Sequence, residues 1–334
     1  MVGSMMPGAV AMFALDASRV FGAAVAAALG QPLLRHEERR FADGEHKVRP
    51  LDPVRGGDVY VLQSLHGGPD LSADDKLCRL LFFLGAVRDA GAARLTAVVP
   101  YLAYARKDRR TQARDPVTTR YVAQLFEAVG VDRVVAVEVH NLVAFQNAFR
   151  CPVEHLDTRR LFIDALVNQL PGGPLAVASP DPGGVKRAQL FREMLEARTG
   201  RAVEPAFMEK RRSGGVVGGT LLTGQVRDAT VIVVDDLIAS GGTMVRAAEA
   251  CRAAGATQVF ALAAHGLFVG DAAAALTNPA LSTTWVTDTV PPFRLEATVL
   301  AGHVQVVSAA PLVARAIARL HGDGSIVDLL GNPG

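Results

Sequence analysis

The stretch of sequence that decides the fold is residues 231–244, which read Val-Ile-Val-Val-Asp-Asp-Leu-Ile-Ala-Ser-Gly-Gly-Thr-Met. Its four consecutive β-branched residues, 231–234, predict a fully buried parallel strand. Asp235 and Asp236 follow at the C-terminal end of that strand, and a helix is expected over 244–254. A strand, a glycine-rich turn and a helix N-terminus form an anion site, because unpaired backbone N–H groups and the helix dipole point at one place.

The polar residues of this stretch indicate what the anion site binds. Ser240 and Thr243 can donate hydroxyl groups to a phosphate, and the glycines at 241 and 242 let backbone approach it. The acidic pair suits ribose hydroxyls, or a Mg²⁺ shared with them. Phosphate donors beside two carboxylates therefore predict a 5-phosphoribosyl pocket. The alternative is a capped strand–helix crossover, and the full order of residues favours the pocket over it.

The bulk composition bounds the class of protein. With 334 residues, 50% of them hydrophobic and 20% charged, the chain is long enough for two globular domains. The net charge of +2 favours no polyanionic partner, so no nucleic acid is expected. Three scattered cysteines indicate a reducing compartment. Because no apolar run reaches the ~20 residues that span a bilayer, we expect a soluble cytoplasmic protein that binds no membrane.

Strand and helix patterns alternate along the whole chain, which predicts an α/β fold with two doubly wound parallel sheets related by duplication. A new series of strands and helices begins after 151–156, so we expect one domain over 1–155 and a second over 156–309. The closing segment 310–334 is expected to pack back on the first domain. Strands are predicted at 9–15, 58–63, 95–99, 133–139, 175–178, 206–209, 258–264, 285–288 and 304–308. Helices are predicted at 18–29, 74–91, 115–130, 185–198 and 311–320.

Polar residues follow several of these strands, where an α/β sheet places its ligands. The cationic loop at 106–110 suits polyphosphate, although a solvated charged loop is the alternative. His140 ends a predicted strand, a position that is more often structural than catalytic. Asp181 lies in a Pro/Gly loop at another strand end and is a candidate metal ligand. Phe41 beside two carboxylates is either a loop anchor or a stacking partner for a purine.

A basic segment precedes a glycine-rich stretch in the second half of the chain. Residues 210–212 read Lys-Arg-Arg, and 213–220 contain four glycines. We expect this stretch to be mobile and to close over a polyphosphate.

These segments together resemble the ribose-phosphate pyrophosphokinase (phosphoribosyl diphosphate synthetase) family. The phosphoribosyl stretch alone is also similar to type I phosphoribosyltransferases. The resemblance extends from about residue 10 to 330. Its landmarks are 41–45, 104–110, 139–140, 179–184, 210–212, 235–243, 264–268 and 286–289.

The resemblance implies two domains of the type I phosphoribosyltransferase fold, Mg²⁺ as cofactor, and ATP and ribose 5-phosphate as substrates. It implies transfer of the diphosphoryl group of ATP to the 1-hydroxyl of the sugar, for nucleotide biosynthesis. It also implies a homo-oligomer, a hexamer or a dimer or tetramer, whose ATP site is shared between subunits.

The resemblance further assigns roles to single residues. The ATP-binding set is Phe41, Asp43, Glu45, Arg106, Lys107, Arg109 and His140. The ribose 5-phosphate set is Asp235, Asp236, Ser240, Gly241, Gly242 and Thr243. The metal set is His140 and Asp181, and the catalytic set is Lys210, Arg212 and His140.

The chain departs from the family pattern at a few positions. Many members have an acidic residue followed by Thr where this chain has Ala239-Ser240, so its ribose 5-phosphate loop is a variant. Lys107 stands where Gln is usual. Two alternatives therefore stay open beside an active synthetase: a catalytically inactive, synthetase-associated regulatory subunit, and a type I phosphoribosyltransferase.

Overall fold

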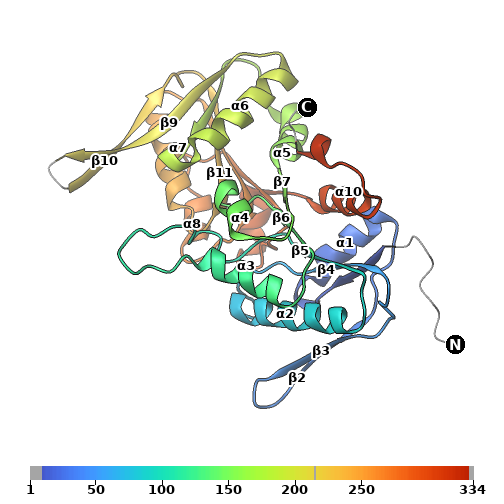
Figure 1. Cartoon of the computed structure of the whole chain (residues 1–334). Helices are drawn as coiled ribbons and strands as arrows, with labels where there is room; N and C mark the ends of the chain where they lie inside the picture. The colour runs from blue at the N-terminus through green and yellow to red at the C-terminus, as the bar shows by residue number, and fades with distance from the viewer. Residues whose placement is uncertain (1–9, 214–215, 331–334) are drawn as a thin grey trace. The chain divides into compact units, whose positions relative to one another are not determined.

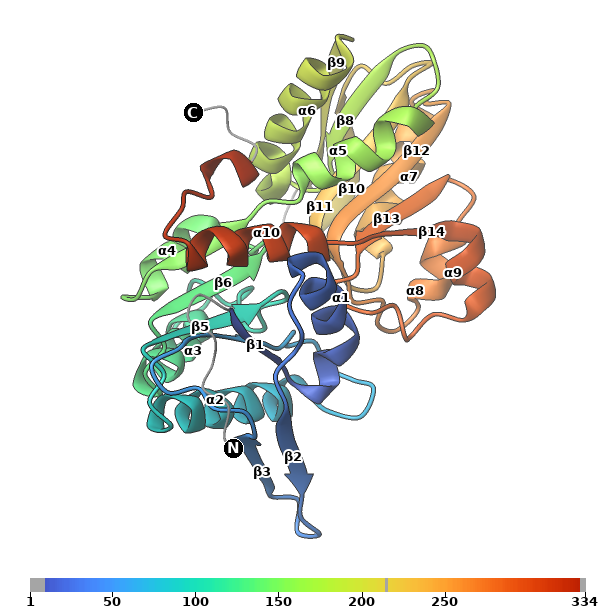
Figure 2. The same cartoon turned by 90° about the vertical axis from the view of Figure 1, so that its right-hand side faces the viewer.

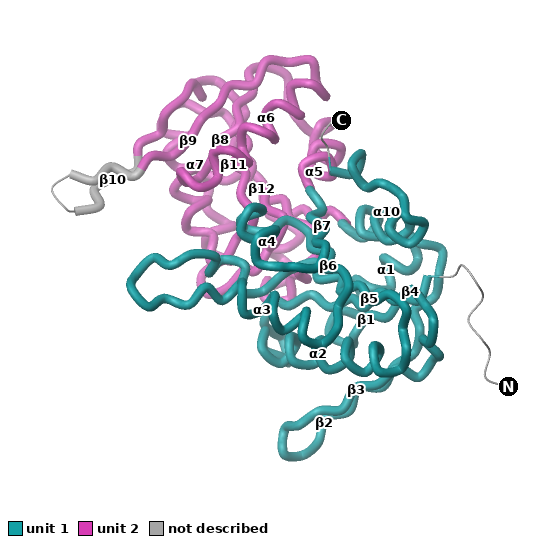
Figure 3. The backbone as a smooth tube through the Cα atoms, viewed as in Figure 1, with its two compact units in different colours: residues 1–157, 309–334 teal, residues 158–308 magenta. Residues whose placement is uncertain are grey.

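The structure is a computed structural model that describes residues 10–213 and 216–330. The chain divides into two compact units (Figure 3). The first comprises Met1–Asp157 and Ala309–Gly334, and the second comprises Thr158–Ser308. Each unit contains a mainly parallel sheet with helices on both faces (Figures 1 and 2), so the predicted α/β class with two doubly wound sheets is confirmed.

The first unit is built on a five-stranded parallel sheet in the order β1-β4-β5-β6-β7. Strands β1, β4, β5 and β6 are almost entirely buried because helices cover both faces of the sheet, which explains their apolar runs, whereas the edge strand β7 is only partly buried. Their bounds are β1 Ala11–Ala14, β4 Asp58–Leu62, β5 Arg94–Val99, β6 Arg133–Val137 and β7 Val153–Leu156. Strand β6 ends two residues before the predicted end, since Glu138 has a positive φ of 39° that no extended strand accommodates.

Helices α2, α3 and α4 pack on one face of this sheet, and α1 and α10 on the other (Figure 2). Helix α2 has a capping box, in which Ser72 and Asp75 satisfy each other's backbone N–H groups. The helices are α1 Arg19–Leu29, α2 Ala73–Asp89, α3 Thr118–Ala128, α4 Leu142–Ala148 and α10 Ala310–His321. Short 3₁₀ turns are η1 Asp16–Ser18 and η4 Val327–Leu329.

A separate antiparallel hairpin, β2 His36–Arg40 and β3 His46–Pro50, extends from the first unit (Figure 2). These two strands are not among the predicted ones, and the sequence His-Glu-Glu-Arg-Arg shows no apolar alternation. Pairing across the hairpin explains the difference: Glu37 lies opposite Arg49, and the two side chains form an ion pair.

The second unit is built on a seven-stranded sheet in the order β10-β9-β8-β11-β12-β13-β14. Of the strand pairs described within this sheet, only the edge pair β9–β10 is antiparallel. Helices α5 and α6 cover one face, and α7 and α8 the other. The strands are β8 Leu175–Ser179, β9 Val203–Ser213, β10 Val216–Gly224, β11 Thr230–Ile238, β12 Gln258–Gly266, β13 Thr283–Thr287 and β14 Val304–Val307. The helices are α5 Arg159–Leu166, α6 Val185–Thr199, α7 Gly242–Ala253, α8 Ala272–Leu276 and α9 Ala297–His303, with 3₁₀ turns η2 Val167–Gln169 and η3 Pro182–Gly184.

Strands β9 and β11 of the second unit extend furthest beyond their predicted bounds. Strand β11 continues four residues past 234, because Leu237 and Ile238 still pair with β12. Strand β9 covers the expected 206–209 and continues into a hairpin with β10, where a loop had been expected from 213 to 220. Residues 214–215 lie outside the described chain, and the mobility expected for this stretch remains a prediction. Among the described residues, no helix is long and apolar enough to cross a membrane.

Candidate active site

The two acidic residues of the phosphoribosyl stretch lie at the C-terminal end of β11, in the middle of the second unit's sheet. Asp236 is buried, with only 3% of its surface exposed. The guanidinium of Arg187, on α6, lies 3.5 Å from Asp235 Oδ1 and 3.5 Å from Asp236 Oδ1. The structure therefore pairs both carboxylates with one cation, a partner that the sequence analysis did not identify.

The environment of this pair changes the acidity of Asp235. Burial raises the pKa of Asp235 to about 8, and the neighbouring Asp236 carboxyl adds to that rise, while Arg187 opposes it. The backbone N–H of Asp236 donates to Asp235 Oδ1 at 2.9 Å. The raised pKa favours the protonated form of this carboxyl when no ligand is bound. A bound cation or a set of donated hydroxyl groups would favour its ionised form.

The loop after β11 leads into the N-terminus of α7. Gly241 precedes the helix with φ 80° and ψ −12°, a left-handed conformation that favours glycine. A Cβ built on Gly241 would lie 2.7 Å from the Cβ of Ala275, so both φ and space require glycine. Among the described residues, no side chain caps α7, so the backbone N–H groups of its first turn keep their capacity to bind an anion. Ser240 and Thr243 border the same turn, as the sequence predicted.

Arg246 adds a positive charge to this phosphate loop. It lies one turn into α7, is exposed, and donates from Nη2 to Thr243 Oγ1 at 3.1 Å. Arg246 was not predicted from the sequence, although its spacing from Thr243 offered a signal, because residues three and four apart on a helix share a face. Arg246 can therefore contribute to binding an anion beside Thr243.

Asp181 reaches the same edge of the sheet from a neighbouring strand. It follows β8, which pairs in parallel with β11, so both strands end at that edge. Its Oδ1 accepts hydrogen bonds from the N–H groups of Gly183 and Gly184 at 2.8 and 3.0 Å, which caps η3. Oδ2 keeps no hydrogen-bond partner among the described residues. The carboxylate is thus held in place by one oxygen and can offer the other to a ligand.

In the first unit, the hairpin β2–β3 presents Phe41, Asp43 and Glu45 at its tip. The guanidinium carbon of Arg39 lies 5.1 Å from the centre of the Phe41 ring, and Phe41 is 38% exposed. The Glu45 N–H donates to Asp43 Oδ1 at 3.1 Å, which tightens the turn. The aromatic face and the carboxylates predicted to bind adenine are therefore available at the surface of this unit.

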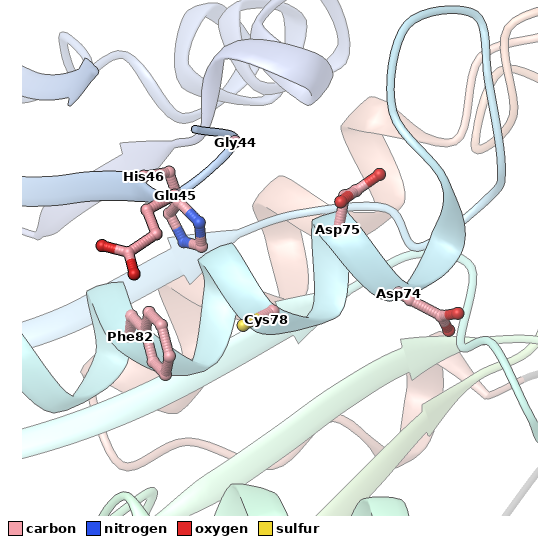
Figure 4. Close-up of a pocket in the computed structure, with 7 residues that line it drawn as sticks. All are labelled: Gly44, Glu45, His46, Asp74, Asp75, Cys78 and Phe82. Carbon is pink, nitrogen blue, oxygen red and sulfur yellow. The ribbon is translucent and has the colours of Figure 1, made fainter. Parts of the chain in front are cut away.

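A pocket of about 570 Å³ lies between the hairpin and α2 (Figure 4). Its wall includes the ring of His46 stacked on Phe82, with ring centres 5.3 Å apart and planes at 18°. Of the residues predicted to contact ATP, only Glu45 lines it. No lysine or arginine is among its lining residues, so its chemistry does not suit a polyphosphate. These residues are Gly44, Glu45, His46, Asp74, Asp75, Cys78 and Phe82.

The cationic loop after β5 is organised by one acidic residue. Asp115 Oδ2 accepts hydrogen bonds from Lys107 Nζ at 2.6 Å and from the Thr111 hydroxyl at 2.7 Å. These bonds hold the pKa of Asp115 well below its usual range. We had expected Asp115 to open a helix, but α3 begins only at Thr118, because Asp115 closes the loop instead. Lys107 is thereby paired within the loop.

Two other predicted ATP residues of this loop, Arg106 and Arg109, are exposed. His140, predicted for ATP, metal and catalysis, is also exposed and lies just after β6. Its neighbour Asn141 donates to Asp108 Oδ2 at 2.6 Å. This hydrogen bond links the cationic loop to the segment that carries His140.

Lys210 and Arg212 both lie on β9, opposite Thr220 and Val217 of β10. Their side chains lie outside what the structure describes, so their catalytic roles remain predictions.

Comparison with known proteins gives matches in both halves of the chain. Residues 10–130 match the family model described as the N-terminal domain of ribose phosphate pyrophosphokinase, and 199–331 match that of the phosphoribosyl synthetase-associated domain. A ribose-phosphate pyrophosphokinase of Haemophilus ducreyi is 39% identical over 290 residues, covering 86% of this chain and 88% of the relative. Another, of Caldanaerobacter subterraneus, is 37% identical over 306 residues, covering 91% and 92%.

A solved structure agrees with these sequence relatives. The crystal structure of phosphoribosylpyrophosphate synthetase from Mycobacterium smegmatis has a TM-score of 0.84 and 31% identity. The similarity covers 94% of this chain and 99% of that one.

Proposed function

The chain belongs to the ribose-phosphate pyrophosphokinase family, and from this membership we propose that it transfers the diphosphoryl group of ATP to the 1-hydroxyl of ribose 5-phosphate. The products are 5-phosphoribosyl 1-diphosphate and AMP, and the proposed role is in nucleotide biosynthesis. The observation that carries the proposal is the end of β11, where two carboxylates held by Arg187 lead directly into an uncapped helix N-terminus.

In this arrangement, different protein groups would bind the phosphate and the hydroxyls of the sugar phosphate. The 5-phosphate would accept hydrogen bonds from the first turn of α7 and from the hydroxyl groups of Ser240 and Thr243. The ribose hydroxyls would donate to Asp235 and Asp236. Since Arg187 already orients both carboxylates, little reorganisation is needed when the sugar binds.

Diphosphoryl transfer requires positioning and positive charge more than a protein nucleophile. The sugar hydroxyl attacks the β-phosphorus, and negative charge builds on the phosphoryl oxygens and on the departing AMP. Lys210 and Arg212 are proposed to balance that charge. For ATP itself, the proposed contacts are Phe41, Asp43, Glu45, Arg106, Lys107, Arg109 and His140.

Mg²⁺ is the proposed cofactor, held by His140 and Asp181. The Oδ2 atom of Asp181 fits this role, because a carboxylate oxygen is the ligand that Mg²⁺ prefers and backbone bonds already fix its partner oxygen. When bound, the ion would neutralise charge on the phosphate oxygens of ATP. The chain's own contribution is to hold the carboxylate in one orientation.

The proposed assembly is a homo-oligomer in which the ATP site is shared between subunits. The separate hairpin β2–β3 supports this arrangement, because it carries Phe41, Asp43 and Glu45 at its tip and not within the sheet of the first unit (Figure 2).

The test is the release of AMP from ATP and Mg²⁺, with and without ribose 5-phosphate. We expect release that depends on the sugar phosphate and falls by about 10²–10³-fold in Lys210→Ala and in Arg212→Ala, as for loss of one preorganised donor. Arg227→Ala is the control, because it removes an exposed arginine of the same unit and should leave the rate unchanged.

Absence of AMP from a folded protein that still binds ATP would refute the synthetase proposal. It would favour the regulatory subunit, and Ala239→Asp would then test the variant loop. Sugar-phosphate transfer to a base, with no use of ATP, would instead indicate a phosphoribosyltransferase.

A further inference from the structure

We propose that Asp16, His36 and Glu38 form a binding site for one divalent transition-metal ion of the zinc type. Asp16 begins η1 and is separated from β1 by Leu15, whereas His36 and Glu38 lie on β2. The Nε2 atom of His36 lies 3.2 Å from Glu38 Oε1 and 3.6 Å from Asp16 Oδ1. One ligand atom from each residue lies within 4.8 Å of the other two.

The spacing of these atoms matches the coordination shell of a small ion. Ligands at about 2.0–2.1 Å from a tetrahedral zinc ion are about 3.4 Å apart from one another. The two distances from the imidazole nitrogen lie on either side of that value. A neutral imidazole has a single N–H and can donate to only one carboxylate at a time. A cation among the three atoms satisfies both carboxylates and the nitrogen.

The surroundings hold two of the three ligands in place. The side chains of His36 and Glu38 are only 3% and 6% exposed. The His36 ring makes edge contacts with Phe13 and Phe83, at centroid distances of 6.5 and 5.6 Å. Arg79 donates to Glu38 Oε2 at 3.2 Å, so Oε1 stays directed at the imidazole. Such outer partners orient the ligands of known metal sites.

The third ligand leaves the site open to solvent on one side. The side chain of Asp16 is 60% exposed, so an ion can enter and a water molecule can complete its shell. The Asp16 N–H also donates to Glu38 Oε1 at 2.6 Å, and Arg19 lies 3.8 Å from Asp16 Oδ1. A carboxylate has about four acceptor positions, so these contacts leave room for an ion.

The ligand types select against Mg²⁺. Magnesium prefers oxygen ligands and keeps most of its water, whereas an imidazole suits zinc and its neighbours in the first transition row. This site shares no residue with the pair proposed to hold Mg²⁺, His140 and Asp181. Because His36 and Glu38 lie at the base of the β2–β3 hairpin, a bound ion would fasten that hairpin to the segment after β1. The inference does not depend on the proposed activity.

Zinc titration of the chelator-treated full chain, in competition with a chromophoric chelator, tests the site. We expect the wild-type chain to bind one zinc ion more than His36→Ala does. His46→Ala is the matched control, since it removes the other hairpin histidine and should keep the extra ion. Arg79→Met should weaken binding by about 10–100-fold, as for loss of an outer partner.

A second variant separates ligand loss from misfolding. Asp16→Asn changes an exposed side chain, so it should keep the wild-type circular dichroism spectrum while losing the extra ion. The proposal is overturned if wild type and His36→Ala bind equal numbers of zinc ions, or if Asp16→Asn binds as tightly as wild type. Displacement of the ion by a few equivalents of Mg²⁺ would also overturn it.

Discussion

Replacing Asp235 by asparagine should make the ligand-free protein more stable at neutral pH. Burial raises the pKa of Asp235 to about 8 in the folded chain, from an ordinary value of 3.8. A folded pKa above the unfolded one gives a stabilising contribution that is full below pH 4. This contribution is lost as the pH rises towards 8. Asparagine has the same shape, can accept the same N–H, and has no proton to lose.

The size of the effect follows from this shift. Each pH unit between the two pKa values changes the free energy of unfolding by about 1.4 kcal/mol. From pH 5 to pH 8 the wild type should therefore lose on the order of 4 kcal/mol relative to Asp235→Asn. For a domain of 150–250 residues, this corresponds to roughly 8–16 °C in melting temperature.

Calorimetric melting of both proteins between pH 5 and pH 8, without divalent cations or nucleotides, measures this difference. Asp271→Asn serves as the control, because it removes an exposed carboxylate of the same unit that makes no capping hydrogen bond. The reasoning is refuted if Asp235→Asn loses stability with pH as steeply as wild type. The same variant should bind ribose 5-phosphate more weakly, so stability and function would change in opposite directions.

Two further substitutions test the same region. Arg187→Met removes the cation from the acidic pair and should raise the KM for ribose 5-phosphate about 10–100-fold, because the carboxylates lose a charged hydrogen-bond partner. Steady-state kinetics measures this change, and Arg187→Lys should recover part of the loss. An unchanged KM in Arg187→Met, or no recovery in Arg187→Lys, would contradict this role. Gly241→Ala should destabilise the protein by about 1–3 kcal/mol, because of its positive φ and the contact with Ala275. Melting should show little change in Gly302→Ala, where an added Cβ meets no atom within 4 Å.

Local chemistry made much of the fold predictable from sequence. The β-branched run at 231–234 predicted a fully buried parallel strand, because a strand covered on both faces is apolar at successive positions. The strands β2 and β3 were not predictable in this way. Their polar residues pair across the hairpin, as Glu37 does with Arg49, and such a pairing is invisible in either strand alone.

In the candidate site too, residues adjacent in sequence could be predicted, whereas residues that only the fold brings together could not. The acidic pair and the glycines of the phosphate loop are neighbours in sequence, so their common role could be inferred directly. Arg187 lies 48 residues before Asp235, and only the adjacency of β8 and β11 brings α6 close to that carboxylate. Asp115 was misread as a helix start for a related reason. A carboxylate before proline is typical of a helix N-terminus, but here its hydrogen bonds close the preceding loop.

Because the chain returns to its first unit at α10, that unit can complete its folding only after the second unit has been synthesised. Helix α10 buries one face against α1, nearly 300 residues earlier, and both belong to the unit formed mainly by the N-terminal half. The ribosome releases residues 158–308 before it releases α10. The second unit is therefore fully synthesised while α1 still lacks its partner. Until residues 310–321 emerge, an apolar surface of the first unit stays uncovered, and the nascent chain is most exposed to aggregation during that interval.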